Sequence, residues 1–325
     1  MGGQRDVDVA PPISAYGFDE SLTNFEGMGP KLLPLTLEPG WSEPKKIWEN
    51  AERLGGPYSW TMRCEITSGF VDAALDFVKR AEKKDQPFFI NLWPDDVHGP
   101  WVPSLKNWKK NIPGLYLSVL TEMDQQLAPL FDYVRNNSRL RDNTLIVFCS
   151  DNGADPKTFD PAEKPLRGSK ATLYEGGVRS PLIVWGPGLL DKKQVGSRNK
   201  DVVIGAMDIA PSLLSLAGVQ SPQSVRFDGE NMIDTLLGND LQSRSTPIFF
   251  SRPPDFKKAF GVEKNMPDLA VRKGPWKLLC NYDGNAVQLY DVTDDPREQH
   301  NLARAHPEVT EELTGQLLDW YRSVR

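Results

Sequence analysis

The feature that most constrains the fold is an alternation of helical and strand-like segments through the middle of the chain. Segments of the first kind carry apolar residues at spacings of three and four, the pattern of an amphipathic helix; they are 71–83, 114–135 and 205–217. Segments of the second kind are short and mostly apolar; they are 88–92, 144–148 and 181–185. Uniform apolarity is typical of strands buried on both faces of a parallel sheet. The alternation predicts an α/β domain in which helices flank a mostly parallel sheet.

The two ends of the chain have a different character. Residues 1–60 are rich in Gly, Pro and Trp without clear periodicity, so they are interpreted as irregular surface segments. Further on, short runs separated by turn residues predict a small antiparallel sheet; they are 247–250, 269–272, 276–279 and 287–290. Residues 307–323 predict a terminal helix that packs on it. We therefore expect an α/β domain over 1–243 and an antiparallel-sheet subdomain over 244–325.

The composition excludes several classes of protein. The chain of 325 residues is 39% hydrophobic and 25% charged, as globular proteins are and disordered or coiled-coil chains are not. No apolar run approaches the roughly 18 residues of a membrane-spanning helix. A net charge of −6 disfavours nucleic acid as a partner, because phosphate binding depends on clustered Lys and Arg. The first residues also lack the apolar stretch of a secretory signal.

Two side chains with oxygen donors, Asp151 and Asn152, directly follow the strand expected at 144–148. Ligands of open α/β sheets gather at the carboxyl ends of the strands. A carboxylate and an amide oxygen suit Ca²⁺ or Mg²⁺ better than a soft transition metal. Asp151 and Asn152 are therefore candidate metal ligands, and the alternative is that Asp-Asn-Gly is only a turn.

A second candidate is the glycine-rich basic segment of residues 166–179. Its glycines allow the backbone to come close to a ligand. Lys170, Arg167 and Arg179 could hold an oxyanion, with the lysine acting as a compact charge and the arginines as planar forks. The alternative is a solvated basic loop.

His98 is the third candidate, in the loop after the strand expected at 88–92. If both strands belong to one sheet, His98 lies at the same edge as Asp151. It could then hydrogen-bond a substrate oxygen or protonate a leaving group. The neighbouring Asp95 and Asp96 could bind metal, but a capping or surface role is the stronger interpretation.

These segments, in this order, resemble the sulfatase family, whose fold is that of alkaline phosphatase. Residues 88–92 with His98 resemble the family's substrate-histidine strand, and residues 146–153 its second metal-binding segment. Lys170 stands four residues before a Tyr-Glu-Gly-Gly sequence at 174–177, as the family's sulfate-binding lysine does. Other segments that resemble family landmarks are 16–19, 208–214 and 289–302.

The resemblance implies a hydrolase of sulfate esters. In this family a hydrated formylglycine, made from the first residue of a Cys/Ser-x-Pro/Ala-x-Arg motif, attacks sulfur beside a divalent cation, usually Ca²⁺. It implies that Asp151 and Asn152 bind the metal and that Lys170 binds sulfate, and Arg167 is a further substrate-binding candidate because of its charge. His98 would contact the substrate and assist the leaving alkoxide. Sulfated carbohydrates are the expected substrates because tryptophans surround the His98 loop; these are Trp93, Trp101 and Trp108.

The nucleophile motif of the family is not found in this sequence. None of the three cysteines is followed by the required residues; they are Cys64, Cys149 and Cys280. Ser42 and Ser251 come near the motif but lack its arginine. We interpret the chain as the carboxy-terminal part of a sulfatase and expect it to be inactive alone. The resemblance implies a periplasmic or extracellular location for the complete enzyme.

Two other functions remain open. A phosphodiesterase or phosphomutase of the same fold would use Asp151 and a histidine to bind one of two transition metals, but Asn152 and Lys170 disfavour this interpretation. A non-catalytic protein could instead use the retained cleft to bind sulfated glycans. Binding of a sulfated oligosaccharide without turnover would distinguish this second alternative.

Overall fold

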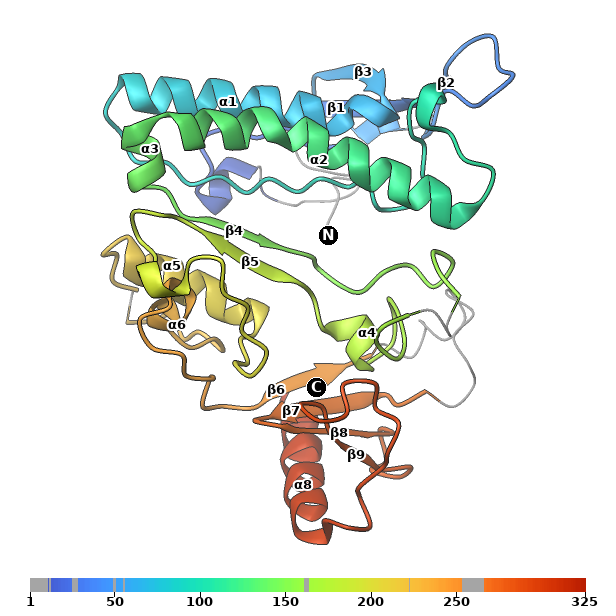
Figure 1. The fold of residues 1–325 in the computed structure, drawn as a ribbon, viewed down its shortest axis with the longest axis vertical. Coiled ribbons are helices and arrows are strands. Elements are labelled where there is room, and N and C mark those ends of the chain that lie inside the picture. Colours follow the sequence, from blue (N-terminus) through green and yellow to red (C-terminus); the bar gives the residue numbers. More distant parts are fainter. Residues whose placement is uncertain are drawn as a thin grey trace. The chain divides into compact units, whose positions relative to one another are not determined.

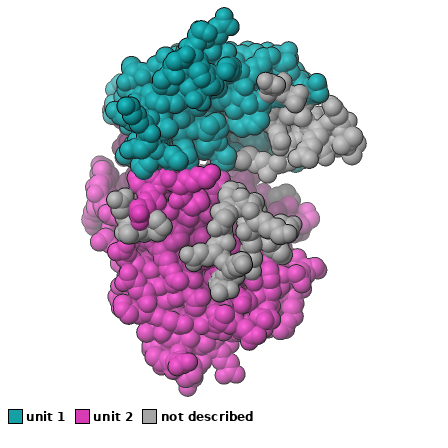
Figure 2. All heavy atoms as spheres, turned by 90° about the vertical axis from the view of Figure 1, so that its right-hand side faces the viewer, with its two compact units in different colours: residues 1–138 teal, residues 139–325 magenta. Residues whose placement is uncertain are grey.

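The computed structural model describes residues 11, 13–24, 29–48, 51–54, 56–160, 164–221, 223–252 and 266–325. The chain divides into two compact units, residues 1–138 and 139–325 (Figure 2). Helices and strands occur in both units, which confirms the α/β class. The domain boundary expected at 243/244 stays a prediction.

The first unit contains a small mixed sheet and two long helices (Figure 1). Strand β1 (Lys31–Thr36) pairs in parallel with β3 (Tyr58–Met62) and antiparallel with β2 (Lys45–Lys46). The long helices are α1 (Ile66–Lys83) and α2 (Ile112–Asn136). Short 3-10 helices complete the unit; they are η1 (Ile13–Tyr16), η2 (Ala51–Leu54), η3 (Arg63–Glu65) and η4 (Leu105–Asn107).

The two long helices confirm the predictions made from periodicity. Their buried side chains recur at helical spacing, and Val71 of α1 packs with Met123 and Leu127 of α2. Asn111 is the N-cap of α2, because its side-chain oxygen accepts a hydrogen bond from the backbone amide of Gly114 at 2.8 Å. Local sequence was therefore sufficient to predict both helices.

Two expectations for the first unit are wrong. Residues 1–60 are not irregular throughout, because β1 and β3 form a parallel pair in which Leu33 is fully buried. Residues 88–92 form no strand, and no described strand pairs with them. An apolar run becomes a strand only where a neighbour satisfies its backbone hydrogen bonds, and Phe89 is instead exposed.

In the second unit, β4 (Ile146–Cys149) and β5 (Leu182–Trp185) confirm the strands expected at 144–148 and 181–185. They pair with each other antiparallel, however, rather than parallel. The expected burial on both faces is also wrong, because Phe148, Leu182 and Ile183 are exposed. Uniform apolarity indicates that a strand can be buried but carries no information about its direction, which explains the difference in direction. The helices of this region are α3 (Ser138–Asp142), α4 (Glu175–Val178), η5 (Lys192–Gln194), η6 (Ala206–Asp208), α5 (Ile209–Leu216) and α6 (Ile233–Leu237).

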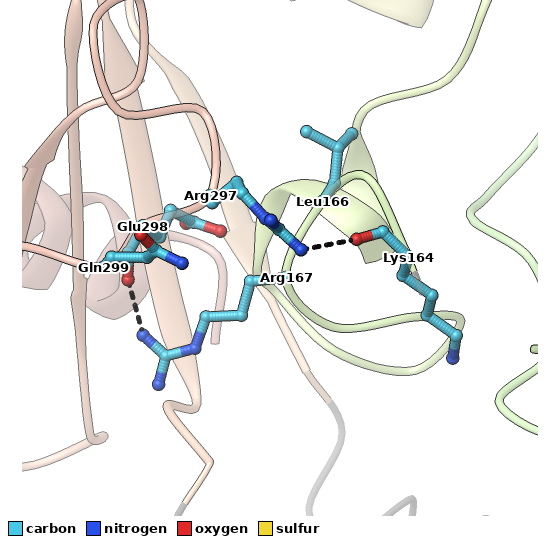
Figure 3. Close-up of a pocket in the computed structure, with 6 residues that line it drawn as sticks. All are labelled: Lys164, Leu166, Arg167, Arg297, Glu298 and Gln299. Atoms are coloured by element: carbon cyan, nitrogen blue, oxygen red, sulfur yellow. Dashed lines mark hydrogen bonds between the residues drawn. The ribbon is translucent and has the colours of Figure 1, made fainter. Parts of the chain in front are cut away.

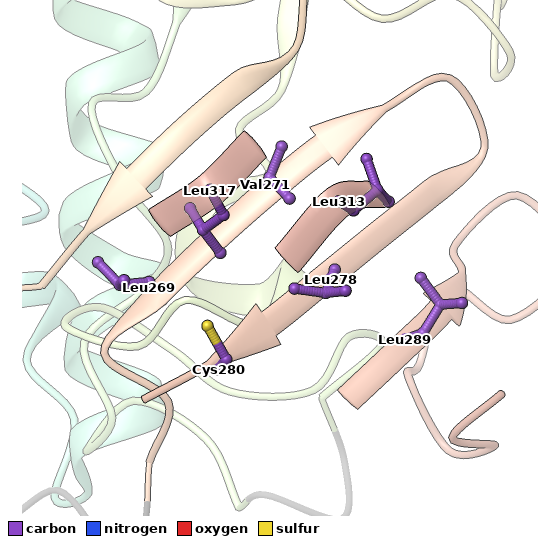
Figure 4. Close-up of a cluster of buried hydrophobic side chains, with 7 residues drawn as sticks. All are labelled: Leu269, Val271, Leu278, Cys280, Leu289, Leu313 and Leu317. Atoms are coloured by element: carbon purple, nitrogen blue, oxygen red, sulfur yellow. The ribbon is translucent and has the colours of Figure 1, made fainter. Parts of the chain in front are cut away.

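The C-terminal region confirms the expected antiparallel sheet and terminal helix. Its four strands lie in sequence order, each antiparallel to the next; they are β6 (Ile248–Ser251), β7 (Leu269–Lys273), β8 (Trp276–Cys280) and β9 (Gln288–Asp291). Helix α8 (Pro307–Ser323) packs on this sheet through Leu313 and Leu317 (Figure 4). The two leucines meet fully buried strand residues such as Leu278, so this cluster forms the core of the region.

No helix in the described ranges combines the length and the apolar character needed to cross a bilayer.

Candidate functional site

Two loops of the second unit carry the predicted metal and sulfate ligands. Asp151 and Asn152 lie in residues 150–154, the metal loop, which begins where β4 ends. Lys170 lies in residues 167–177, the lysine loop, whose end forms most of α4. The metal loop follows a strand end and Lys170 lies in the irregular part of the lysine loop before α4, and binding groups are commonly found on such loops.

Backbone hydrogen bonds join the metal loop to the lysine loop. The amide of Gly153 donates to the carbonyl of Gly177 at 3.0 Å, and the amide of Lys170 donates to the carbonyl of Ala154 at 2.9 Å. The contact requires glycine, because a Cβ on Gly153 would lie 1.8 Å from the carbonyl oxygen of Gly176. The structure thus places the candidate metal ligands and the candidate sulfate-binding lysine on adjoining backbone.

The side chains of the metal loop fit part of a calcium site. Asp151 is exposed and Asn152 is partly buried, and both offer the hard oxygen donors that Ca²⁺ prefers. Calcium takes roughly six to eight oxygen ligands, so these two would supply a minority. The described part of the chain contains no group of three or more His, Cys, Asp or Glu side chains that could hold a metal. Metal binding by this pair therefore stays a prediction.

A buried ion cluster, which sequence reasoning missed, fixes the end of the lysine loop. The cluster consists of Lys277 on β8, Glu175 at the start of α4, and Glu298; we call it the Lys277 cluster. The ammonium of Lys277 lies 2.9 Å from Oε1 of Glu175 and 3.0 Å from Oε1 of Glu298. The carboxylate of Glu298 also accepts a hydrogen bond from the amide of Glu175 at 2.7 Å. These contacts tie α4 to the C-terminal sheet.

All three members of the Lys277 cluster are withdrawn from water. Lys277 and Glu298 are 0% exposed and Glu175 is 7% exposed. Burial raises the pKa of Glu298 above its usual value, and the charge of Lys277 opposes that rise. A signal for this cluster exists in the sequence, because Lys277 stands among apolar residues in a strand where a charge needs a partner. Nothing local, however, identifies the partner.

Arg167 braces the lysine loop against the C-terminal sheet. Its guanidinium stacks on the ring of Tyr174 at 3.8 Å, and its Nη1 donates to the hydroxyl of Tyr290 at 3.1 Å and to the carbonyl of Glu298 at 2.9 Å. These contacts give Arg167 a structural role. Its predicted part in sulfate binding stays a prediction.

His98 belongs to the first unit and is exposed. The buried Arg63 fixes the loop of His98, because its guanidinium donates hydrogen bonds to the carboxylate of Asp95 and to the carbonyl of His98. Asp96 is buried and accepts a hydrogen bond from Thr67, so of the capping or surface role predicted for it the surface part is wrong. Burial raises the pKa of Asp96. The two acids therefore shape the loop, and convergence of His98 with the metal and lysine loops stays a prediction.

Comparison with protein families gives a direct match. The family described as "Sulfatase" matches residues 41–219, more than half of the chain. The chain belongs to the sulfatase family. A second family description, "N-sulphoglucosamine sulphohydrolase, C-terminal", matches residues 169–323 of this sulfatase-family chain.

Curated sulfatases are similar to this chain over most of its length. The N-acetylgalactosamine-6-O-sulfatase of Bacteroides thetaiotaomicron is 30% identical over an alignment of 276 positions, which covers 77% of this chain and 50% of that protein. The N-acetylgalactosamine-6-sulfatase of Homo sapiens is 31% identical over 195 residues, 59% of this chain and 36% of that protein. The chain spans half or less of the length of these relatives.

Solved sulfatase structures share the fold. The crystal structure of Ps i-CgsB matches with a TM-score of 0.66 and 26% identity. The match covers 78% of this chain and 54% of the Ps i-CgsB chain. The structure of BT33336S-sulf, from work on glycosaminoglycan metabolism by Bacteroides thetaiotaomicron, matches with a TM-score of 0.65 and 26% identity. The match covers 86% of this chain and 59% of the BT33336S-sulf chain. The sulfatase-family chain thus has the α/β fold of the alkaline-phosphatase-like proteins, with the four-stranded C-terminal sheet and its helix.

Proposed function

We propose that this chain supplies the sulfate-binding and metal-binding part of an enzyme that hydrolyses sulfate esters of carbohydrates. The observation that carries the proposal is the hydrogen-bonded pairing of the metal loop with the lysine loop, which brings Asp151, Asn152 and Lys170 onto adjoining backbone. Membership of the sulfatase family supports the reaction class. The substrate class is supported by relatives whose names specify N-acetylgalactosamine 6-sulfate and by a neighbour solved with k-i-k-neocarrahexaose.

Each residue has a role that follows from its chemistry. The ammonium of Lys170 neutralises sulfate oxygens, and the guanidinium of Arg167 supplies directed donors to a neighbouring anionic group of the substrate. Asp151 and Asn152 hold Ca²⁺, or Mg²⁺, which when bound polarises the sulfate group. His98 contacts the substrate and donates a proton to the leaving alkoxide.

The carbohydrate preference has some support around His98. The side chain of Trp93 is 68% exposed, so its ring is available to a sugar face. Trp101 instead makes contacts within the protein. Its indole NH donates a hydrogen bond to the carbonyl of Val97, and its ring packs edge-on against Tyr116. We propose a periplasmic or extracellular location for the complete enzyme, where such glycans are found.

The absence of a formylglycine motif from this sequence favours a second function for the chain by itself, the binding of sulfated glycans without turnover. The 325-residue chain should therefore show no hydrolysis of an aryl sulfate, and measurable turnover would contradict this part of the proposal.

Lys170→Ala should weaken binding of N-acetylgalactosamine 6-sulfate by roughly 10-fold to 100-fold, because a hydrogen bond to a charged group is worth about 1.5–3 kcal/mol. Isothermal titration calorimetry in the presence of Ca²⁺ measures the change. Lys192→Ala is the matched control, since Lys192 is an exposed lysine of the same unit in η5. Equal affinities for the Lys170→Ala variant and the unmodified chain would refute the role of Lys170.

A further inference from the structure

A pocket of about 550 Å³ lies beside the lysine loop, within the second unit. It is lined by Lys164, Leu166, Arg167, Arg297, Glu298 and Gln299 (Figure 3). Its volume falls within the range of roughly 300–1,000 Å³ that is usual for small-molecule sites. Its lining comes from two distant stretches of sequence, which the Lys277 cluster and Arg167 hold together.

The lining of this pocket is cationic. Among the described lining residues, Lys164, Arg167 and Arg297 carry positive charge, whereas the one acidic residue, Glu298, directs its carboxylate to Lys277. Asp155 and Asp160 lie close enough to Lys164 to offset part of its charge. The two guanidinium groups therefore provide most of the excess positive charge.

Both guanidinium groups are fixed in place and retain donors for a ligand. Arg297 donates from Nη2 to the carbonyl of Lys164 at 2.9 Å, and Arg167 donates only from Nη1 (Figure 3). Within the described residues, the other nitrogens of these two side chains make no hydrogen bond. A guanidinium that is already oriented loses less freedom when it binds, and its planar fork matches the oxygens of sulfate or carboxylate.

The pocket is also close to the candidate sulfate site. Arg167 is three residues from Lys170, so their Cα atoms are within about 11 Å even for a fully extended chain. A substituent on the next sugar of an oligosaccharide is a suitable occupant at that separation. A single anionic monosaccharide bound at Lys170 would leave the pocket unfilled.

We propose that this pocket binds a second anionic group of the substrate, a sulfate or a carboxylate on the sugar next to the one whose sulfate Lys170 holds. The substrate would then be an oligosaccharide with anions on neighbouring sugars rather than a monosulfated monosaccharide. This inference rests on the proposed function for its first anion, but the pocket itself can be tested separately.

Calorimetry with three probes tests the proposal. The probes are N-acetylgalactosamine 6-sulfate, its disaccharide with glucuronic acid, and a disaccharide sulfated on both sugars. At least one of the two dianionic disaccharides should bind about tenfold tighter than the monosaccharide, and the one that does so identifies the second group as carboxylate or sulfate. Arg297→Gln and Lys164→Gln should each reduce that gain and leave the affinity for the monosaccharide unchanged.

Arg304→Gln is the control. Arg304 follows Arg297 in the sequence and is also exposed, but it does not line the pocket. Thermal melting of each variant shows that it remains folded. If neither disaccharide gains affinity, or if the gain survives in both pocket variants, the pocket proposal is wrong. If the monosaccharide fails to bind while a disaccharide binds in an Arg297-dependent way, the pocket is supported and the role of Lys170 is refuted.

Discussion

Lys277→Met should lower the free energy of unfolding by about 3–5 kcal/mol, the usual cost of removing one partner from a buried ion pair. Lys277 is 0% exposed and lies 2.9 and 3.0 Å from the carboxylates of Glu175 and Glu298. Without the ammonium, the two carboxylates face each other in a site that excludes water. Urea denaturation of the whole chain, with the slope compared between variants, measures the loss.

The same variant should show a characteristic pH dependence. Burial raises the pKa of Glu298, and Lys277 opposes this rise in the unmodified protein. In the variant, the pKa of Glu298 in the folded state lies further above its pKa in the unfolded chain. At a pH between these two pKa values, the folded protein therefore binds more protons than the unfolded chain. The deficit in stability should therefore be smaller at about pH 5 than at about pH 8.

Lys273→Met is the matched control for this experiment. Lys273 is the last residue of β7 and pairs with Glu312 at 2.7 Å, but both side chains are largely exposed. An exposed ion pair contributes about 0–1 kcal/mol, so the control should be nearly neutral. A loss for Lys277→Met no larger than that of the control would show that the cluster does not stabilise the protein.

Gly153→Ala should destabilise the protein by about 1–3 kcal/mol and weaken sulfate binding at Lys170 by about tenfold. The new Cβ would lie 1.8 Å from the carbonyl oxygen of Gly176 and 2.8 Å from its carbonyl carbon. Both are backbone atoms that no rotamer change can move away. The metal loop must therefore shift, and the hydrogen bond from Lys170 to Ala154 shifts with it.

Thermal denaturation and calorimetry with N-acetylgalactosamine 6-sulfate measure these two effects of Gly153→Ala. The control is Gly315→Ala in α8, where no atom lies within 4 Å of the new Cβ. An alanine in a helix is favoured over glycine by about 0.5–1 kcal/mol, so the control should be slightly more stable than the unmodified chain. Unchanged sulfate affinity in Gly153→Ala would show that the metal loop does not position Lys170.

Sequence predicted those parts of the fold that depend on neighbouring residues. Helices α1, α2 and α8 follow from apolar spacing, and the hairpin between β7 and β8 follows from Gly274, whose φ of +57° suits the tight turn. Strand direction in the β4–β5 pair was not predictable, because direction depends on the partner and not on the strand. Strand β1 was not predicted, because Pro34 interrupts its run of strand-forming residues.

The candidate site was predicted in part for the same reason. Asp151, Asn152 and Lys170 stand in motifs that a short window reveals, and the hydrogen bonds between their loops agree with the expected proximity. The Lys277 cluster was missed because its partners are separated by about a hundred residues, as Glu175 and Lys277 are. No periodicity connects residues at such a separation.

The Lys277 cluster also bears on how this chain can be recombined with its relatives. Glu175 lies before residue 243, whereas Lys277 and Glu298 lie after it, so a chimaera joined at that point would take one carboxylate from one parent and the other two groups from the second. Such a hybrid needs compatible residues at all three positions. Exchange of the C-terminal sheet should succeed only between parents that place a lysine and two glutamates there.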